Sequence, residues 1–456
     1  MNLKAFIAIL CCRILRFLSR VLHRGGTAMP GRIAVKICPD LLSILAKNVR
    51  TIAITGTNGK TTSARMVEEA FSEEGFSYFA NRSGANLMSG IVTEFVMNST
   101  LGGSCKKEYA IIECDEAAAR SVFGQLKPAV ILVTNLFRDQ LDRYGEVTHT
   151  LENIRIGIQS VPEALLCLNA DCSLTSSLAE DLPNPHVFYG IEKGAVVSRD
   201  KPELSDATHC IRCKTEYVYD YMTYGHLGGY RCPHCGYCRQ DTQIAVVKVA
   251  SLRPDGTDLI MRIHGKQFGV QVNLPALYNV YNAAGALTSA VEAGVKVETA
   301  VRALAAFRCG FGRMETFDLG GGTRRRLGKN PAGCNQVLEF LQEIRDPFQL
   351  VICLNDRSAD GTDVSWIWDA DFEKLTDLQG KMERVYLSGD RTGDIHVRLK
   401  YAGVPEETIT EERDYEVLVQ MLAKTETPVY IMPTYTALLD LRAVIVRHCG
   451  GSEFWE

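Results

Sequence analysis

The chain has 456 residues, enough for two or three domains that each bury a core of their own. Hydrophobic residues make up 46% of the chain and charged residues 23%, the composition of an ordinary globular protein. The formal net charge of −4 gives no electrostatic attraction to nucleic acid, so we exclude nucleic acid as the main partner.

Sixteen cysteines are spread along the chain, mostly among hydrophobic neighbours, and one group of them is clustered. A secreted disulfide framework is typical of short chains with closely spaced cysteines and does not fit a chain of this length. The distribution therefore indicates the reducing cytoplasm.

Residues 1–45 are predicted to form an amphipathic helical segment. An early Lys and the apolar run 5–12 resemble a signal peptide, but no small-residue cleavage site follows them. Arg13, Arg16 and Arg20 interrupt the apolar sequence, which is therefore too short to span a bilayer. No later stretch is predicted to cross a membrane.

Apolar residues recur at helical spacing in this segment, at Leu3, Ile7, Leu10, Ile14, Leu18 and Leu22. Such a stripe favours a helix that packs on the body of the protein. Because basic residues occupy the rest of the helix, the alternative is a helix that rests on an anionic membrane surface.

The stretch 46–318 is predicted to be a central α/β domain. Short β-branched runs at 51–55, 109–114 and 129–135 are typical of buried parallel strands. Each run is followed by a polar turn or a helix. This alternation predicts a doubly wound α/β fold.

Residues 205–240 interrupt that pattern, because they are rich in Cys, Tyr, Gly and His and have little continuous hydrophobicity. Runs typical of antiparallel strands follow at 246–253, 257–265 and 266–275, before a helix through 282–293. The Cys-rich stretch is therefore predicted to be an insertion in the central domain.

A Gly- and Arg-rich stretch at 320–329 predicts a domain boundary. Beyond it, three strand-like runs at 348–355, 384–389 and 428–433 are separated by helices. The segment 319–456 is therefore predicted to be a second α/β domain.

The clearest functional motif lies between the strand at 51–55 and the helix that follows. Glycines let a backbone approach phosphate oxygens, and a helix N-terminus presents N–H groups to them. Lys60 adds a positive charge, and the Thr61 hydroxyl is a candidate Mg²⁺ ligand. The predicted ATP-binding loop consists of Gly56, Thr57, Asn58, Gly59, Lys60, Thr61 and Thr62.

The general Walker pattern requires a Gly six residues before the Lys, where this chain has Ile54. The shorter form Gly-Thr-Asn-Gly-Lys-Thr-Thr resembles the ATP loop of the Mur ligases and folylpolyglutamate synthetases. Glu113, after a strand, resembles the Mg²⁺-binding acid of that family; the alternative is a solvated acid. The run 135–142 resembles a further family segment, but Gln140 replaces its His and speaks against a second, His-ligated metal.

Three further matches to the family concern the nucleotide. Asn279 and Asn282 match its Asn-x-x-Asn at a helix start, where they could cap the helix or bind adenine. Arg313 matches an arginine that would stabilise the transferred phosphoryl group. Asp356 stands where the family places an acid on the ribose.

The clustered cysteines form two Cys-x-x-Cys pairs with eighteen residues between them. Two such knuckles can place four thiolates around Zn²⁺, and a site with all four positions filled is structural. Free or redox thiols are the alternative, and Cys238, His209 and His234 are less favoured ligands. The predicted zinc ligands are Cys210, Cys213, Cys232 and Cys235.

Within the Mur ligases, the chain resembles one subgroup, the MurT subunits of lipid II isoglutaminyl synthase. The segment 81–86, the cysteine insertion and the runs 329–333 and 355–369 carry this resemblance. About fifty residues precede the phosphate loop, too few for the UDP-binding domain of other Mur ligases. The implied fold is a Mur ligase central P-loop ATPase domain with an inserted zinc ribbon, followed by a Rossmann-like α/β domain.

The resemblance implies a carbon–nitrogen ligase of peptidoglycan synthesis. ATP would convert the α-carboxylate of D-glutamate in lipid II into an acyl phosphate, and ammonia would attack it to give D-isoglutamine. Two other functions are weighed against this one. They are a free-standing Mur or folylpolyglutamate-type amino-acid ligase and a non-catalytic nucleotide-binding scaffold.

The resemblance also implies a partner, a class I-like glutaminase subunit of the GatD type that supplies ammonia in a heterodimer. In the family, the glutaminase takes the acid of its catalytic triad from the ligase subunit, and the matching residue is Asp363. Asp360, Asp369 and Asp371 lie nearby and compete for that role. The implied location is the cytoplasm, at the inner face of the membrane if the N-terminal helix contacts lipid.

Overall fold

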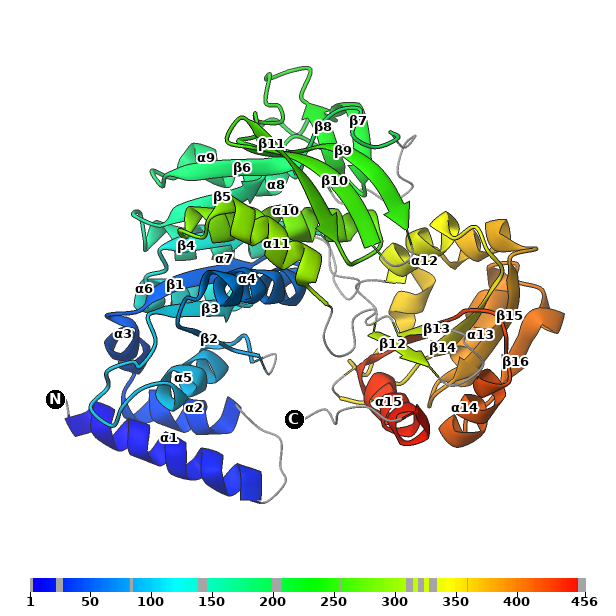
Figure 1. Ribbon diagram of the computed structural model, residues 1–456, viewed down its shortest axis with the longest axis horizontal. Helices are drawn as coiled ribbons and strands as arrows, with labels where there is room; N and C mark the ends of the chain where they lie inside the picture. The colour runs from blue at the N-terminus through cyan, green and yellow to red at the C-terminus, as the bar shows by residue number, and fades with distance from the viewer. Residues whose placement is uncertain are drawn as a thin grey trace. The chain divides into compact units, whose positions relative to one another are not determined.

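In the computed structural model the chain forms two units (Figure 1). The first unit comprises Met1–Arg138 and Asp142–Phe307, and the second comprises Asp139–Leu141 and Arg308–Glu456. The structure describes residues 3–21, 28–82, 85–137, 146–198, 207–253, 256–308, 315–318, 324–327, 334–358 and 360–449.

A nine-stranded sheet in the order β11-β10-β9-β6-β5-β4-β1-β3-β2 forms the centre of the first unit. From β2 to β9 neighbouring strands run parallel, whereas β9, β10 and β11 are antiparallel to one another. The strands are β1 (Arg50–Thr55), β2 (Tyr78–Ala80), β3 (Tyr109–Glu113), β4 (Val130–Val133), β5 (Leu165–Asn169), β6 (His186–Ile191), β9 (Ile244–Arg253), β10 (Gly256–Ile263) and β11 (Lys266–Val272).

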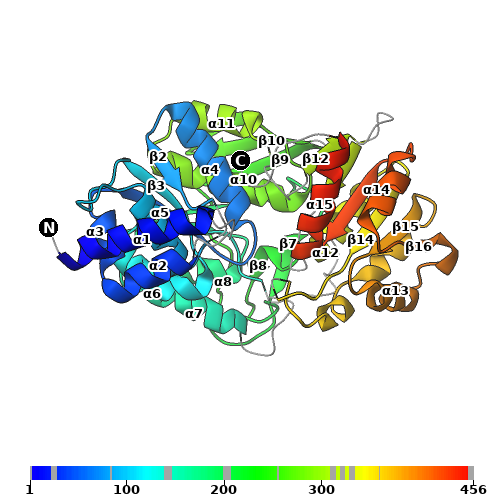
Figure 2. The same ribbon diagram turned by 90° about the horizontal axis from the view of Figure 1, so that it is seen from below.

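Helices cover both faces of the parallel part of this sheet, which is why β3 and β4 are buried along their whole length. Helices α4 (Lys60–Glu74), α10 (Leu277–Glu292) and α11 (Val297–Ala306) lie on one face. Figure 2 shows α6 (Glu116–Leu126) and α7 (Glu146–Gln159) on the other face. Two short helices, α8 (Ser173–Ser176) and α9 (Leu178–Asp181), follow β5. The predicted doubly wound strands and the antiparallel run after the insertion are both confirmed.

The N-terminal segment belongs to the first unit and consists of α1 (Leu3–Val21), α2 (Ala28–Ile37) and α3 (Leu41–Ala46). Helix α1 packs on α2 and α5 (Met88–Met97) through a face of Ala5, Ala8, Ile9 and Cys12, all buried. The expected packing of this helix on the body of the protein is confirmed. The stripe that predicted it is not the packing face, because its five members within α1 are exposed and smaller residues on the opposite side make the contact; Leu22, its sixth member, lies outside the described residues. Among the described residues, no helix is long and apolar enough to cross a membrane.

The predicted insertion forms a small substructure of its own. Strands β7 (Val218–Tyr224) and β8 (Leu227–Arg231) pair as an antiparallel hairpin outside the large sheet. Its core combines aromatic rings with two of the clustered thiols: Cys210, Tyr217, Tyr230, Cys232 and Tyr237.

The second unit is built on a six-stranded sheet in the order β12-β13-β17-β14-β15-β16, parallel except for the β12–β13 pair. The strands are β12 (Glu315–Asp318), β13 (Arg324–Leu327), β14 (Phe348–Cys353), β15 (Met382–Ser388), β16 (Ile409–Glu411) and β17 (Val429–Pro433). The helices between and after them are α12 (Cys334–Glu343), η2 (Ser365–Trp368), η3 (Phe372–Leu378), α13 (Thr392–Tyr401), η4 (Glu406–Thr408), α14 (Tyr415–Ala423) and α15 (Tyr435–Cys449).

This sheet corrects the expected domain boundary after Asp318. Strand β12, which ends at that residue, pairs with β13 and so belongs to the second unit. Contacts place the division between Phe307 and Arg308. The expectation came from the Gly- and Arg-rich composition of residues 320–329, of which Arg324–Leu327 form β13.

Candidate active site

The predicted phosphate loop joins β1 to α4, at the point where the strand order reverses direction. Strand β1 has β3 on one side and β4 on the other, so the carboxyl ends of all three strands meet at one edge. Ligands of open α/β sheets bind at such an edge. The ends of these strands carry Thr55, Glu113 and Thr134.

Two glycines give the loop its path. The φ angles of Gly56 and Gly59 are +118° and +84°, in a region that residues with a Cβ rarely adopt. A Cβ at Gly56 would lie 2.4 Å from the Thr134 hydroxyl, and one at Gly59 would lie 1.9 Å from Oδ1 of Asn282. The loop therefore lies tightly between the end of β4 and the start of α10.

Replacing these glycines tests the arrangement, because α4 has a left-handed glycine at each end. Gly75 has a φ of +83° and open space around its Cβ position. We expect Gly75→Ala to lower the free energy of unfolding by about 1–2 kcal/mol, the cost of a left-handed alanine. Gly59→Ala should lower the free energy of unfolding by distinctly more, because the added methyl group would also collide with Asn282. Both values are measured by urea unfolding. Equal losses in the two variants would contradict the contact.

Residues after β4 hold the loop backbone from the other side. The Thr134 hydroxyl donates to the Asn58 carbonyl at 2.8 Å, and the Asn135 side chain accepts from the Asn58 N–H at 3.0 Å. The Thr57 N–H donates to the Asn135 carbonyl at 2.8 Å. These bonds fix the loop before any ligand binds.

Lys60 opens α4 and folds over the loop. Its Nζ donates to the Gly56 carbonyl at 2.5 Å and to the Thr57 carbonyl at 3.2 Å. It also forms an ion pair of 3.0 Å with Glu116, at the start of α6. Burial raises the pKa of Glu116, and the Lys60 ammonium opposes that shift. Sequence reasoning missed Glu116, whose only signal was that it is a further acid three residues after Glu113.

Thr61 and Glu113, the two predicted Mg²⁺ ligands, are brought together. The Thr61 hydroxyl donates to Oε2 of Glu113 at 2.6 Å, although 52 residues separate the two in the chain. Asn81 fixes the Glu113 backbone, because its side chain donates to the Glu113 carbonyl at 2.8 Å and accepts from the Glu113 N–H at 2.9 Å. A carboxylate and a hydroxyl beside a phosphate loop are oxygen ligands of the kind that Mg²⁺ prefers.

Asn279 and Asn282 are both buried near the start of α10. Neither caps the helix, since its N-cap is Ala276; Asn279 instead donates to the Pro275 carbonyl at 2.7 Å. Asn282 donates to Asn279 Oδ1 at 3.1 Å, and its own Oδ1 lies against Gly59. The pair therefore supports the phosphate loop from the side opposite β4.

The insertion reaches the same loop through Phe137. The Phe137 ring lies 4.6 Å from the ring of His226, at the turn of the β7–β8 hairpin, and 5.6 Å from that of Tyr224. The Thr57 hydroxyl is 3.2 Å from both the carbonyl and the N–H of Phe137. His226 is fully buried, and this burial lowers its pKa to about 4. It therefore packs as a neutral aromatic ring.

A buried carboxylate connects the insertion to the sheet. Asp171, just after β5, accepts from Arg239 at 2.6 Å, from the Tyr281 hydroxyl at 2.6 Å and from the Ile191 N–H at 2.8 Å. Burial raises the pKa of Asp171, and the Arg239 guanidinium opposes that shift. Three donors and a partner charge compensate the cost of burying the carboxylate.

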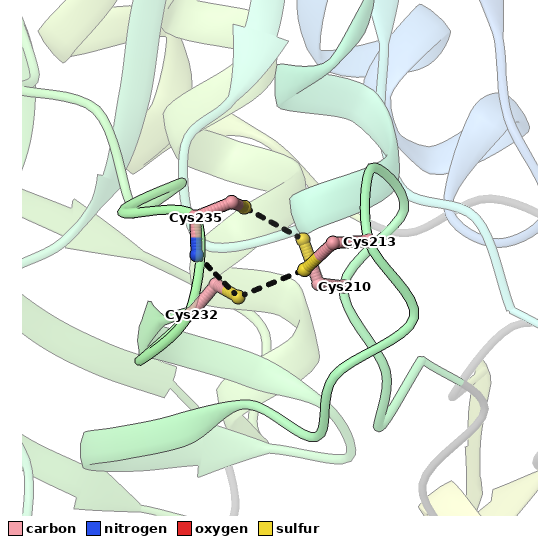
Figure 3. A group of neighbouring side chains, drawn as sticks. All are labelled: Cys210, Cys213, Cys232 and Cys235. Atoms are coloured by element: carbon pink, nitrogen blue, oxygen red, sulfur yellow. Dashed lines mark hydrogen bonds between the residues drawn. The ribbon is translucent and has the colours of Figure 1, made fainter.

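The four predicted zinc ligands come together within the insertion (Figure 3). Their Sγ atoms all lie within 4.8 Å of one another, and two pairs are 3.5 and 3.4 Å apart. The two knuckles share one backbone hydrogen-bond pattern. The Lys214 N–H donates to the Cys210 carbonyl, and the Gly236 N–H donates to the Cys232 carbonyl. Hydrogen bonds from Thr215, and then from neighbouring thiols, lower the pKa of Cys213 to about 5. Convergent thiols of this kind fit a tetrahedral metal ion.

The second unit carries two further predicted residues. Asp356 follows β14 and lies 3.3 Å from Arg391. Asp363 is exposed, and its Oδ1 accepts from the Ser365 N–H at 2.8 Å. Arg313 and Gln140 lie outside the described residues.

Two of the acids that compete with Asp363 for the triad role are bound to side chains of other residues. Asp360 accepts from the N–H and the hydroxyl of Thr436 at the start of α15. Asp371 lies 3.2 Å from Lys374. Asp369 is exposed, like Asp363. Of the four candidate triad acids, only Asp363 and Asp369 are therefore exposed.

Comparisons with protein families agree with this geometry. The chain matches the Mur ligase middle domain over residues 54–290 and the MurT ligase C-terminal domain over residues 327–438. It is 34% identical over 447 residues to subunit MurT of the glutamine-hydrolysing lipid II isoglutaminyl synthase of Streptococcus pneumoniae, covering 98% of each chain. Subunit MurT of the same enzyme of Staphylococcus aureus (strain COL) is 32% identical, with 99% of this chain and 100% of that one covered.

Solved structures show the same fold at low sequence identity. A pseudomurein peptide ligase type C from Methanothermus fervidus gives a TM-score of 0.65 at 18% identity, covering 88% of this chain and 79% of that one. MurF from Acinetobacter baumannii gives 0.65 at 14% identity, with coverage of 90% and 80%. Folylpolyglutamate synthase from Mycobacterium tuberculosis gives 0.60 at 13% identity, with coverage of 89% and 93%.

Proposed function

The chain belongs to the MurT family of Mur ligases, and from this premise we propose that it amidates lipid II in peptidoglycan synthesis. The substrate is the α-carboxylate of D-glutamate, the nitrogen donor is ammonia, and ATP supplies the energy. The observation that carries the proposal is the cluster of Lys60, Thr61 and Glu113 around a preformed phosphate loop.

The chemistry consists of two transfers. The substrate carboxylate attacks the γ-phosphorus of ATP, and ADP leaves, which yields an acyl phosphate. Ammonia then attacks the carbonyl carbon, loses a proton and displaces phosphate, which leaves the amide. The protein contributes positioning and stabilisation of charge, as in other phosphoryl transfers.

Each part of the site has a role in this scheme. The loop N–H groups and Lys60 would hold the phosphates, and Thr61 and Glu113 would hold Mg²⁺, which would supply neutralisation of the phosphate charge. Arg313 stabilises the transferred phosphoryl group. For the nucleotide itself, the match to the family names Asn279 and Asn282 in the first unit and Asp356 in the second.

The experiment supplies the chain with ATP, Mg²⁺, lipid II and ammonium chloride. We expect one ADP per amide formed and no product without ATP. An amino acid offered in place of ammonium should give no ligation. Turnover with an amino acid and not with ammonium would instead favour a free-standing ligase of the folylpolyglutamate type.

For the cysteine cluster we propose a structural Zn²⁺ in a zinc ribbon. Cys210, Cys213, Cys232 and Cys235 provide four thiolates, so the site leaves no position for a substrate. The metal would join two knuckles that are otherwise held by turns and by packing of tyrosine rings.

Removal of one thiol should separate a zinc site from a cluster of free cysteines. We expect about one zinc per chain in the wild type and, in Cys213→Ser, a zinc affinity at least about tenfold lower. Cys238→Ser is the matched control, because Cys238 is exposed and lies outside the cluster. Zinc is measured by metal analysis after dialysis against a chelator. Equal zinc content in both variants would contradict the assignment.

The name of the relatives describes a subunit of a glutamine-hydrolysing enzyme. We therefore propose a heterodimer with a class I-like glutaminase of the GatD type in the cytoplasm. The second unit, with its mostly parallel sheet, is the Rossmann-like part that contacts this partner. Asp363, which the resemblance matches to the acid donated by the ligase subunit, completes the partner's triad. Its exposure and the hydrogen bond that its Oδ1 accepts from the Ser365 N–H support this role.

A further inference from the structure

Helix α1 presents a second apolar face, opposite the one that packs on the protein. Six large hydrophobic side chains of this helix are exposed, by 39 to 71% of their surface. They are Leu3, Ile7, Leu10, Ile14, Phe17 and Leu18. Figure 1 shows α1 at the outer edge of the first unit, with α2 beside it. A patch of this kind on a fixed helix marks an interaction site.

The two faces are separated by the geometry of the helix. Successive residues are about 100° apart, so the six exposed side chains fall within an arc of roughly 100°. The four buried residues, from Ala5 to Cys12, fall within a second arc on the opposite side. Lys4 and Arg13 lie in the two gaps between the arcs, one on each side.

The helix is held firmly to the first unit. Arg13 donates to the carbonyl of Val96, in the last turn of α5, at 3.2 Å and also to that of Ser99, just beyond the helix. Ala8, Ile9 and Cys12 have no exposed surface. The outward face is therefore presented by a docked helix, and burying it requires no unfolding of the chain.

Every charged residue in the first 39 positions of the sequence is basic. The first acidic residue of the chain is Asp40, although the whole chain has a net charge of −4. Arg32 and Lys36 are exposed on the neighbouring helix α2. The basic residues before Asp40 are Lys4, Arg13, Arg16, Arg20, Arg24, Arg32 and Lys36. This concentration complements a negatively charged partner.

We propose that the outward face of α1 lies in the interface of an anionic phospholipid bilayer. Its apolar stripe would enter the boundary of the acyl chains while the basic flanks remain among the headgroups. This proposal rests on the proposed function in that the substrate is a lipid. An enzyme docked on the bilayer would meet that substrate at the membrane surface.

A second copy of the chain fits this face less well. If two copies of α1 met face to face, their basic flanks would lie against each other, and the repulsion between like charges would disfavour the dimer. A bilayer of anionic lipid satisfies the apolar stripe and the flanking charges together.

The test uses the full-length chain and vesicles of phosphatidylglycerol mixed with phosphatidylcholine. We expect the wild type to float with these vesicles, to bind pure phosphatidylcholine more weakly and to dissociate as the salt concentration rises. The double variant Ile14→Ser with Phe17→Ser should bind at least about tenfold more weakly, because two side chains no longer enter the bilayer.

The matched control is Val397→Ser with Val417→Ser, which makes the same kind of change at exposed positions of α13 and α14. It should bind vesicles like the wild type. Equal binding by the two double variants would overturn the proposal. So would failure of the wild type to float, or a dimer in sedimentation analysis that only the α1 variant abolishes.

Activity separates this proposal from the proposed function. With ammonium and a water-soluble substrate that lacks the lipid chain, the α1 variant should amidate as fast as the wild type. With lipid II embedded in vesicles, the amidation rate of the α1 variant should fall by about the same factor as its affinity for the vesicles. Vesicle binding without turnover of either substrate by the wild type would reject the proposed function and leave the membrane contact supported.

Discussion

Replacing Lys60 by alanine is expected to lower the rate of ATP-dependent amidation by about 100- to 1,000-fold, since one fixed donor to the transferring phosphate is lost. Lys60 already lies over the loop, 2.5 Å from the Gly56 carbonyl. The rate is measured with lipid II and ammonium, so that no glutaminase step contributes. Lys107→Ala, at an exposed position of the same unit, is the control and should keep the wild-type rate.

Loss of Lys60 also removes the partner of a buried acid. Burial raises the pKa of Glu116 and the Lys60 ammonium lowers it, so in Lys60→Ala the pKa of Glu116 should rise further. Glu116 then takes up a proton more readily, which limits the structural damage. The double variant Lys60→Ala with Glu116→Gln should be at least as stable as the single variant and equally inactive. Recovery of activity in the double variant would show that the loss was structural.

The sequence was sufficient for the layout of the phosphate site. Buried parallel strands are continuous apolar runs, so 51–55, 109–114 and 129–135 could be recognised locally, and the loop between strand and helix followed from its glycines. Thr61 and Glu113 were each expected to bind Mg²⁺, Glu113 from its resemblance to the family's acid. They lie together because the loop and Glu113 follow neighbouring parallel strands.

Contacts between side chains of distant elements could not be predicted in this way. Glu116 pairs with Lys60 only because α6 starts beside α4, and Asn81 binds Glu113 only because β2 lies next to β3. The contact between Phe137 and His226 depends on how the inserted hairpin folds back onto the sheet. No periodicity in the sequence carries that information.

Helix α1 shows a different limit of pattern reasoning. The large apolar residues formed the obvious stripe, yet the face that packs is made of Ala5, Ala8, Ile9 and Cys12. Small residues let helices approach closely; at Gly31 of α2, a Cβ would lie 1.7 Å from the Ser89 carbonyl oxygen of α5. A prediction from hydrophobicity alone therefore identified the exposed face of α1 as its packing face.

Replacing Asp363 by asparagine is expected to lower glutamine-dependent amidation by about 1,000- to 10,000-fold, the effect of losing the acid from a catalytic triad. Asn can still accept the Ser365 N–H through its own Oδ1, so the local turn should persist. It cannot stabilise a charged imidazole in the partner. The measurement compares amidation from glutamine, with the glutaminase present, and amidation from ammonium.

The same Asp363→Asn protein should use ammonium at the wild-type rate, because Asp363 is not one of the residues proposed to hold ATP, Mg²⁺ or the transferred phosphoryl group. Asp369→Asn is the matched control, an exposed acid six residues further along the chain, and should affect neither reaction. Loss of both reactions in Asp363→Asn would reject the triad role and indicate a part in ligation itself. Loss of the glutamine reaction in Asp369→Asn alone would assign the triad acid to Asp369, since both carboxylates are exposed whereas Asp360 and Asp371 are held by Thr436 and Lys374.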